Sequence, residues 1–177
     1  MQALSSTLAG NEIHPVNFVF QSSSIWIGWV SADEPGEAVV TNDGKILWGL
    51  SQRDLVKRCA DVYGAVAIES ATMFDMNKVL DGLCSRKAAS DEVINCWNML
   101  KDVSLALGAP RAVYRFDGVA EDRAYMAFFS ATSGGELLGF AGGQVADRDF
   151  EVAKEVISNG VLMLLDATVQ VRSQGRR

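Results

Sequence analysis

Four short apolar segments follow one another in the first fifty residues, with turn-forming residues between them. They are rich in β-branched and aromatic side chains, as strands with at least one buried face require. Asp43 and Gly44 separate the last two, and an Asp-Gly pair suits a two-residue type I′ turn because both residues tolerate positive φ. The pattern therefore predicts an N-terminal antiparallel meander. Its strands are residues 16–20, 25–30, 37–41 and 45–48.

The next block has the 3.6-residue period of amphipathic helices and predicts three of them. Ser51 can cap the first helix through the amide of Asp54, and Gly64 is placed to end it. A second helix is expected after Thr72, and the third runs from Ser90 to Leu107. The apolar stripes are Leu55, Cys59, Val62 and Val66, then Met73, Met76, Leu80 and Leu83, then Val93, Trp97, Leu100, Val103 and Leu107.

Beyond Pro110 the pattern again favours strands. Residues 112–116 alternate between apolar and polar, and residues 125–130 and 136–141 flank the dipeptide Gly134-Gly135. Apolar segments joined by a glycine pair are typical of a β-hairpin. The sequence therefore predicts a second antiparallel hairpin in this half of the chain.

A C-terminal helix is expected from Asp147, with an inward face made by Phe150, Ala153, Val156 and Ile157. Residues 160–172 fit either period, helix or strand. Because Asn159-Gly160 would cost a continuous helix roughly 1 to 2 kcal/mol in propensity, the pattern favours a helix, a turn and a last strand. The order of strands, helices, strands and helix predicts an α+β fold, and 177 residues suit one domain over residues 1–177, with 173–177 as a frayed basic tail.

Composition places the chain among ordinary globular proteins, at 49% hydrophobic and 21% charged residues. No apolar run approaches the 18 or so residues that a membrane helix needs. Residues 1–10 lack the positive charge and long apolar block of a secretory signal, so a cytoplasmic location is expected. Cys59, Cys84 and Cys96 have no CxxC spacing and are odd in number, so we expect buried thiols rather than disulfides.

Residues for common catalytic chemistry are scarce. His14 is the single histidine, and at the start of a strand we expect it to be structural. The phosphate-binding and dinucleotide-binding glycine motifs are missing from the sequence. Carboxylate pairs occur, but they resemble turn and helix-cap residues. No catalytic, cofactor-binding or metal residue is predicted, and the chain is not expected to be an enzyme. The carboxylate pairs considered are Asp117 with Glu121 or Asp122, and Asp147 with Asp149.

Net charge is concentrated in one segment. The first basic residue is Lys45, so residues 1–44 contain five acids and no base, whereas the rest of the chain has 17 acids and 16 bases. Nearly all of the formal charge of -6 therefore lies in the first quarter. Arg111, Arg115 and Arg123 form the one basic cluster outside the C-terminal tail, and acids interrupt it. Nucleic-acid binding is disfavoured, because it needs a continuous basic surface.

The acidic segment and the predicted strand that follows it, at residues 45–48, are also rich in tryptophan. Three of the four tryptophans are Trp26, Trp29 and Trp48, and alternation along a strand turns Trp26 away from the face of Trp29. Aromatic side chains supply binding energy and carboxylates supply steering, which predicts a site for a basic protein. The alternative is that the tryptophans are core residues and the acids solvate turns. The predicted partner-binding residues are Trp26, Asp33, Glu34, Glu37, Asp43 and Trp48.

These features favour a non-catalytic, cytoplasmic protein-binding inhibitor. Bacterial immunity proteins and antitoxins that mask a basic toxin domain are commonly small, acidic and free of catalytic motifs, and the comparison is one of type only. An acidic secretion or assembly chaperone is an alternative, and a homodimer is compatible with it. A ligand-binding domain or a small carboxylate-dependent enzyme is the alternative from a different class.

Overall fold

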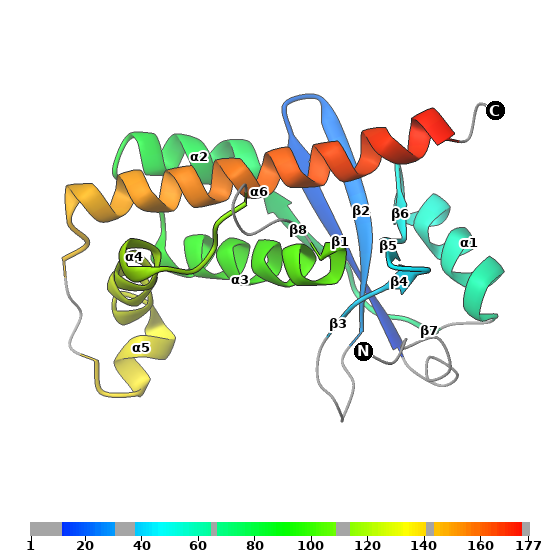
Figure 1. The fold of residues 1–177 in the computed structure, drawn as a ribbon. Coiled ribbons are helices and arrows are strands. Elements are labelled where there is room, and N and C mark those ends of the chain that lie inside the picture. The colour runs from blue at the N-terminus through cyan, green and yellow to red at the C-terminus, as the bar shows by residue number, and fades with distance from the viewer. Residues whose placement is uncertain (1–11, 31–37, 65–66, 109–113, 141–143, 175–177) are drawn as a thin grey trace. The chain divides into compact units, whose positions relative to one another are not determined.

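The computed structural model describes residues 12–30, 38–64, 67–108, 114–140 and 144–174 (Figure 1). Strands come first and helices dominate the rest, so the predicted α+β class is confirmed. The chain divides into two compact units. Met1–Asp75 with Leu105–Gly108 is called the sheet unit here, and Met76–Ser104 with Ala109–Arg177 the helical unit. One domain over residues 1–177 stays a prediction.

The sheet unit is built around a long antiparallel hairpin. Strands β1 and β2 pair along eight residues, from Ile13 opposite Val30 to Phe20 opposite Ser23. Strand β2 also pairs antiparallel with β3 and β6, which confirms the predicted meander. On its other side β1 pairs with β7 and β8, and these two strands are parallel to it. The strands are β1 Glu12–Phe20, β2 Ser23–Val30, β3 Ala38–Val39, β6 Trp48–Gly49, β7 Ala67–Ile68 and β8 Thr72–Asp75.

A small separate hairpin confirms the predicted Asp-Gly turn. Strands β4 (Thr41–Asn42) and β5 (Lys45–Ile46) pair antiparallel. Between them Asp43 has φ 51° and Gly44 has φ 71°. Positive φ at both central residues is the requirement of a type I′ turn, so the local sequence sets this turn.

Helix α1 (Gln52–Tyr63) forms as its cap residues predict. Ser51 accepts a hydrogen bond from the Asp54 amide at 3.1 Å, and Gly64 ends the helix with φ 81°. The expected stripe is correct at Leu55 and Cys59 but wrong at Val62, which is exposed. Val66 lies outside the described residues. The core on this face of the sheet is Ile13, Val30, Val40, Leu55 and Cys59.

The second predicted helix begins later than the pattern indicates. Residues 72–75 form β8, and α2 (Met76–Cys84) starts only after it. Phe74 lies opposite Phe18 in the register of β8 and β1, and their rings stack at 5.5 Å. Met73 is 67% exposed. The prediction of the helix start rested on the helical spacing of Met73 and Met76. Pairing of β8 with β1 outweighs that spacing.

Four further helices follow in the described part of the chain, with α3 (Ser90–Leu107) at the predicted boundaries. In the helical unit α2 runs alongside α6 (Figure 1), and α4 also packs against α6. Among the helices in the described part of the chain, none is both long and apolar enough to cross a membrane. The other three helices are α4 Val119–Ser130, α5 Ser133–Leu137 and α6 Asp147–Gln174.

The predicted second hairpin is wrong, because residues 125–130 belong to α4 and residues 136 and 137 to α5. Ala124 and Phe128 lie one helical turn apart and are both fully buried. Thr132 accepts a hydrogen bond from the Gly135 amide, so the two glycines open a helix rather than a β-turn. The predicted strand at 112–116 is also wrong for its described residues, because residues 114–116 are not in a strand. Residues 112–113 of that strand, and Ala141 at the end of the predicted hairpin, lie outside the described residues.

The predicted last strand is wrong as well, because α6 continues as a helix to Gln174. The expected inward face of Phe150, Ala153, Val156 and Ile157 is confirmed. Gly160 is buried, and a Cβ on it would lie 2.6 Å from Leu100 Cδ1. The glycine therefore permits close approach of α6 to α3, and this packing offsets its low helix propensity. The backbone of residues 173–174 is helical, whereas residues 175–177 of the predicted tail lie outside the described range.

Two of the three cysteines are buried as expected, and Cys84 at the end of α2 is exposed. Burial raises the pKa of Cys59 to about 11 and that of Cys96 to about 12. Both thiols are therefore protonated at pH 8, and the thiolate is the reactive form. We expect a thiol-specific disulfide reagent to titrate one thiol in the native chain at pH 8 and three after denaturation. Rapid reaction of two or three native thiols would contradict the burial of Cys59 and Cys96.

Candidate functional site

Trp26 lies on the face of the hairpin that the alternation predicts. It is opposite Asn17 in the β1–β2 pairing, whereas Ile25 and Ile27 project from the other face. Helix α1 covers the same face as Trp26, and the half-buried indole packs against the cluster beneath that helix. The tryptophan is therefore partly a core residue, with only part of its ring at the surface.

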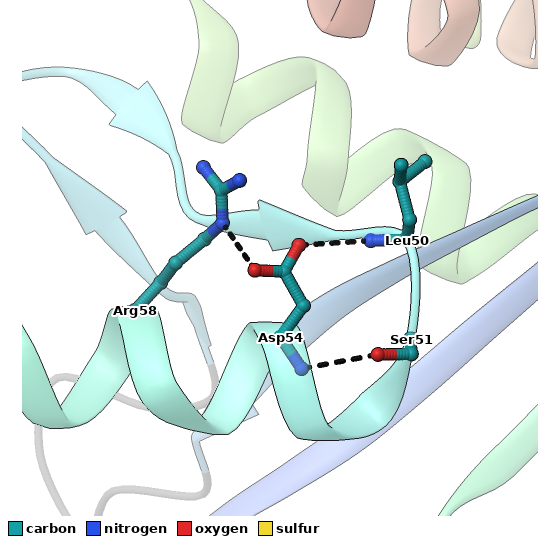
Figure 2. A network of polar contacts seen from close by, with 4 residues as sticks. All are labelled: Leu50, Ser51, Asp54 and Arg58. Carbon is teal, nitrogen blue, oxygen red and sulfur yellow. Dashed lines mark hydrogen bonds and ion pairs between the residues drawn. The ribbon is translucent and has the colours of Figure 1, made fainter.

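Trp48 is held under a cation from its own chain. It is only 6% exposed in β6, and the Arg58 guanidinium of α1 lies 5.6 Å from its ring centroid. Arg58 donates to Asp54 at 3.1 Å, and the other Asp54 oxygen accepts from the Leu50 amide at 3.2 Å (Figure 2). A cation over a tryptophan contributes about 0.5 to 1 kcal/mol at an exposed site.

The same network keeps Asp54 ionised. Burial favours the neutral acid, but the hydrogen bonds from Arg58 and from the Leu50 amide outweigh it and lower the pKa of Asp54. Ser51 fixes the start of α1 and so places Asp54 and Arg58 one turn apart (Figure 2). The local helix start therefore places a carboxylate and a guanidinium together over the buried Trp48 ring.

The predicted acidic residues can be placed only in part. Asp43 is exposed at the tip of the β4–β5 turn, and Asp33, Glu34 and Glu37 lie outside the described residues. The net charge nevertheless differs between the two units. The sheet unit has nine acidic and four basic residues, a net charge of -5, whereas the helical unit has 13 and 12, a net charge of -1. The acidic excess is therefore a property of the sheet unit.

His14 has two partners that sequence reasoning missed. From β1 its Nε2 lies 2.7 Å from Thr72 Oγ1 in β8, and its Nδ1 lies 3.2 Å from Glu69 Oε2. The partners are 58 and 55 residues further along the chain. The parallel pairing of β7 and β8 with β1 brings them together, and these short strands carry no strong pattern in the sequence. The result is a carboxylate, an imidazole and a hydroxyl in a row.

Glu12 adds a second carboxyl beside this row. A hydrogen bond with Glu69, and then the charge of Glu69, raise the pKa of Glu12. The same hydrogen bond, followed by the one with His14, lowers the pKa of Glu69. Glu69 is therefore the carboxyl that stays ionised next to the imidazole, while Glu12 is the one that retains a proton more readily.

The carboxylate pairs considered from the sequence are partly used in ion pairs. Asp149 is almost fully buried and accepts from Arg123 Nη2 at 2.7 Å and Nε at 3.0 Å. Asp147 pairs with Arg86, and Glu121 with Arg115, each at 3.1 Å. Within the part of the chain that the structure describes, no group of three or more His, Cys, Asp or Glu side chains could hold a metal ion.

Comparison of the chain with protein-family models, with curated proteins and with solved structures gave no match. The function is therefore argued from the arrangement of the residues themselves. Two features of the sheet unit carry chemistry. One is its acidic excess with the half-buried Trp26, and the other is the row formed by Glu69, His14 and Thr72.

Proposed function

We propose that this chain is a cytoplasmic protein-binding inhibitor, of the kind of a bacterial immunity protein or antitoxin, which masks a basic domain of its partner. The observation that carries the proposal is the charge of the sheet unit, -5 out of a total of -6. A negative surface attracts a basic protein over several ångströms and speeds its association. Masking a cationic cleft needs only such a surface, so this role requires no catalysis.

Trp26, the partly exposed tryptophan of this unit, would supply short-range binding energy. Trp26 is half-buried, and Trp48 lies under Arg58 beside the Asp54 carboxylate. Tryptophans that are already fixed by packing lose little conformational entropy when a partner covers them. Arginine side chains of a basic partner are suited to the carboxylates of this unit and to the exposed part of the Trp26 ring. These groups belong to the unit that carries the charge.

Reversal of the predicted acidic site should weaken binding. The partner is first isolated by co-purification with the chain from its native host, and its affinity is then measured by calorimetry at low and high salt. For Asp33, Glu34 and Glu37 changed together to Lys we expect at least a 10-fold loss at 50 mM salt and a smaller loss at 500 mM, because salt screens exposed charges. Affinity equal to that of the unchanged chain at both salt concentrations would remove this site.

A matched control separates the site from net charge. Asp81, Asp122 and Glu155 are exposed residues of the helical unit, and their joint change to Lys alters the net charge by the same amount. We expect this variant to lose much less affinity than the sheet-unit variant. Equal losses would show that only the total charge matters. A co-purified secretion substrate in place of a toxin domain would favour the chaperone alternative.

A further inference from the structure

We propose that Thr72, His14 and Glu69 form a nucleophile site that takes an acyl group from esters, an activity separate from masking a partner. Thr72 Oγ1 is the nucleophile and His14 the general base, while Glu69 is a positioning residue that orients the imidazole. A hydroxyl hydrogen-bonded to a base that a third group orients is the recurrent arrangement of activated nucleophiles.

The two hydrogen bonds fix the direction in which the proton can move. With Glu69 accepting from Nδ1–H at 3.2 Å, the neutral imidazole has its free lone pair on Nε2. Thr72 Oγ1 lies 2.7 Å from that nitrogen, and in this tautomer the hydroxyl is the donor and Nε2 the acceptor. Both distances are within the reach that proton transfer to a general base requires.

The three side chains stand on paired backbone, which keeps their geometry rigid. His14 lies in β1 opposite Trp29 of β2, and Thr72 of β8 lies opposite Val16, which is two residues from His14 and on the same face. The Glu69 amide donates to the Ile13 carbonyl at 3.0 Å. Catalytic groups supported by strands are held more precisely than groups on free loops.

The row is open to solvent from one side. The side chain of His14 is 27% exposed and that of Glu69 is 49% exposed, whereas Thr72 is half-buried. For acyl transfer a small ester would approach the hydroxyl from the side on which His14 and Glu69 are exposed. Glu12 and Glu69 place two carboxyl groups beside the site, which repel anionic substrates. The substrate class is an ester with a neutral or cationic acyl group.

The reaction conserves atoms and charge in two steps. Thr72 Oγ1 forms a bond to the acyl carbon while its proton passes to His14 Nε2, and the ester C–O bond then breaks as the leaving alcohol takes that proton. Water then forms a bond to the acyl carbon of the acyl-threonine while one of its protons passes to Nε2. The bond from that carbon to Thr72 Oγ1 breaks as Oγ1 takes the proton from Nε2, and the carboxylic acid leaves. The ester and water are the only reactants, and Thr72 and His14 return to their starting forms.

The test uses the full chain and p-nitrophenyl acetate, a neutral activated ester. p-Nitrophenolate release is followed by absorbance, and the acetyl group is located by peptide mass spectrometry. We expect acetylation of Thr72, its complete loss in Thr72→Val and its retention in Thr72→Ser. In His14→Gln the rate of labelling should fall by about 10²-fold or more, the range of general-base catalysis. Thr41→Val, at a half-buried threonine in the same unit, should label like the unchanged chain.

The substitution Glu69→Gln tests whether Glu69 assists acyl transfer or only stabilises the fold. Glutamine keeps an oxygen that accepts from Nδ1–H but removes the charge that stabilises the protonated imidazole. We expect an unchanged thermal midpoint and a fall in the labelling rate of at least 10-fold. The proposal is overturned if Thr72 is not acetylated in the unchanged chain, if His14→Gln labels at the original rate, or if Thr72→Ser, folded by circular dichroism, is not labelled.

Discussion

Replacement of Gly135 by alanine should lower the free energy of unfolding by about 2 to 3 kcal/mol, the upper part of the range for overpacked sites. A Cβ at this position would lie 2.2 Å from the Phe129 carbonyl oxygen and 3.0 Å from Ser130 Cα. Both are backbone atoms at the end of α4, so no side chain can rotate away. Relief of the clash requires α5 to move away from α4, which breaks the Thr132 cap.

Gly134 provides a control one residue away in the same helix. A Cβ there would meet only Thr132 Oγ1, at 3.7 Å, which is ordinary contact. Gly134→Ala should therefore stabilise the chain by about 0.5 to 1 kcal/mol, because alanine restricts the unfolded chain and favours the helix. Denaturant unfolding followed by circular dichroism measures both variants. Destabilisation of similar size in both would contradict the structure of α5.

The same pair of variants distinguishes the helix from the hairpin that the sequence predicts. In a type I′ turn both glycines would have positive φ, and alanine would be strained at either one. In the structure neither Gly134 nor Gly135 is among the residues with positive φ, whereas Asp43 and Gly44 in the β4–β5 turn are. Opposite signs for the two substitutions are expected only from the helix.

Elements with complete local signals were predicted well. The Asp43-Gly44 turn has residues that tolerate its φ angles, α1 has a cap at Ser51 and a glycine at its end, and α3 has one continuous apolar stripe. In each case the residues that decide the structure lie within a few positions of one another. Local propensity and the final packing then agree, and the sequence alone is sufficient.

The errors occur where a distant contact decides. Phe18 draws Phe74 into β8, and the close approach of Leu100 makes Gly160 a helix residue. His14 gains Glu69 and Thr72 through parallel strand pairing, which no nearby residue reports. The acidic excess could be predicted because net charge is a sum over the residues of a segment. The position of Arg58 over the Trp48 ring could not, because it depends on how α1 packs against β6.

Phe128→Ala should give the largest loss of stability, about 3 to 5 kcal/mol, as for other fully buried aromatic residues. Its ring is 0% exposed and meets the Phe150 ring edge-on, with centroids 5.1 Å apart, so truncation leaves a cavity between α4 and α6. For a protein of this size the thermal midpoint should fall by roughly 6 to 20 °C, at 2 to 4 °C per kcal/mol.

Met126 is the matched control for this substitution. In a strand, residues 126 and 128 would share a face and their truncations would have similar costs. In α4 they lie about 160° apart around the helix axis, and Met126 is 42% exposed. Met126→Ala should therefore change the free energy of unfolding by less than about 1 kcal/mol. Thermal unfolding of the two variants side by side checks this, and comparable losses would show that residues 125–130 do not form the helix that packs Phe128 against Phe150.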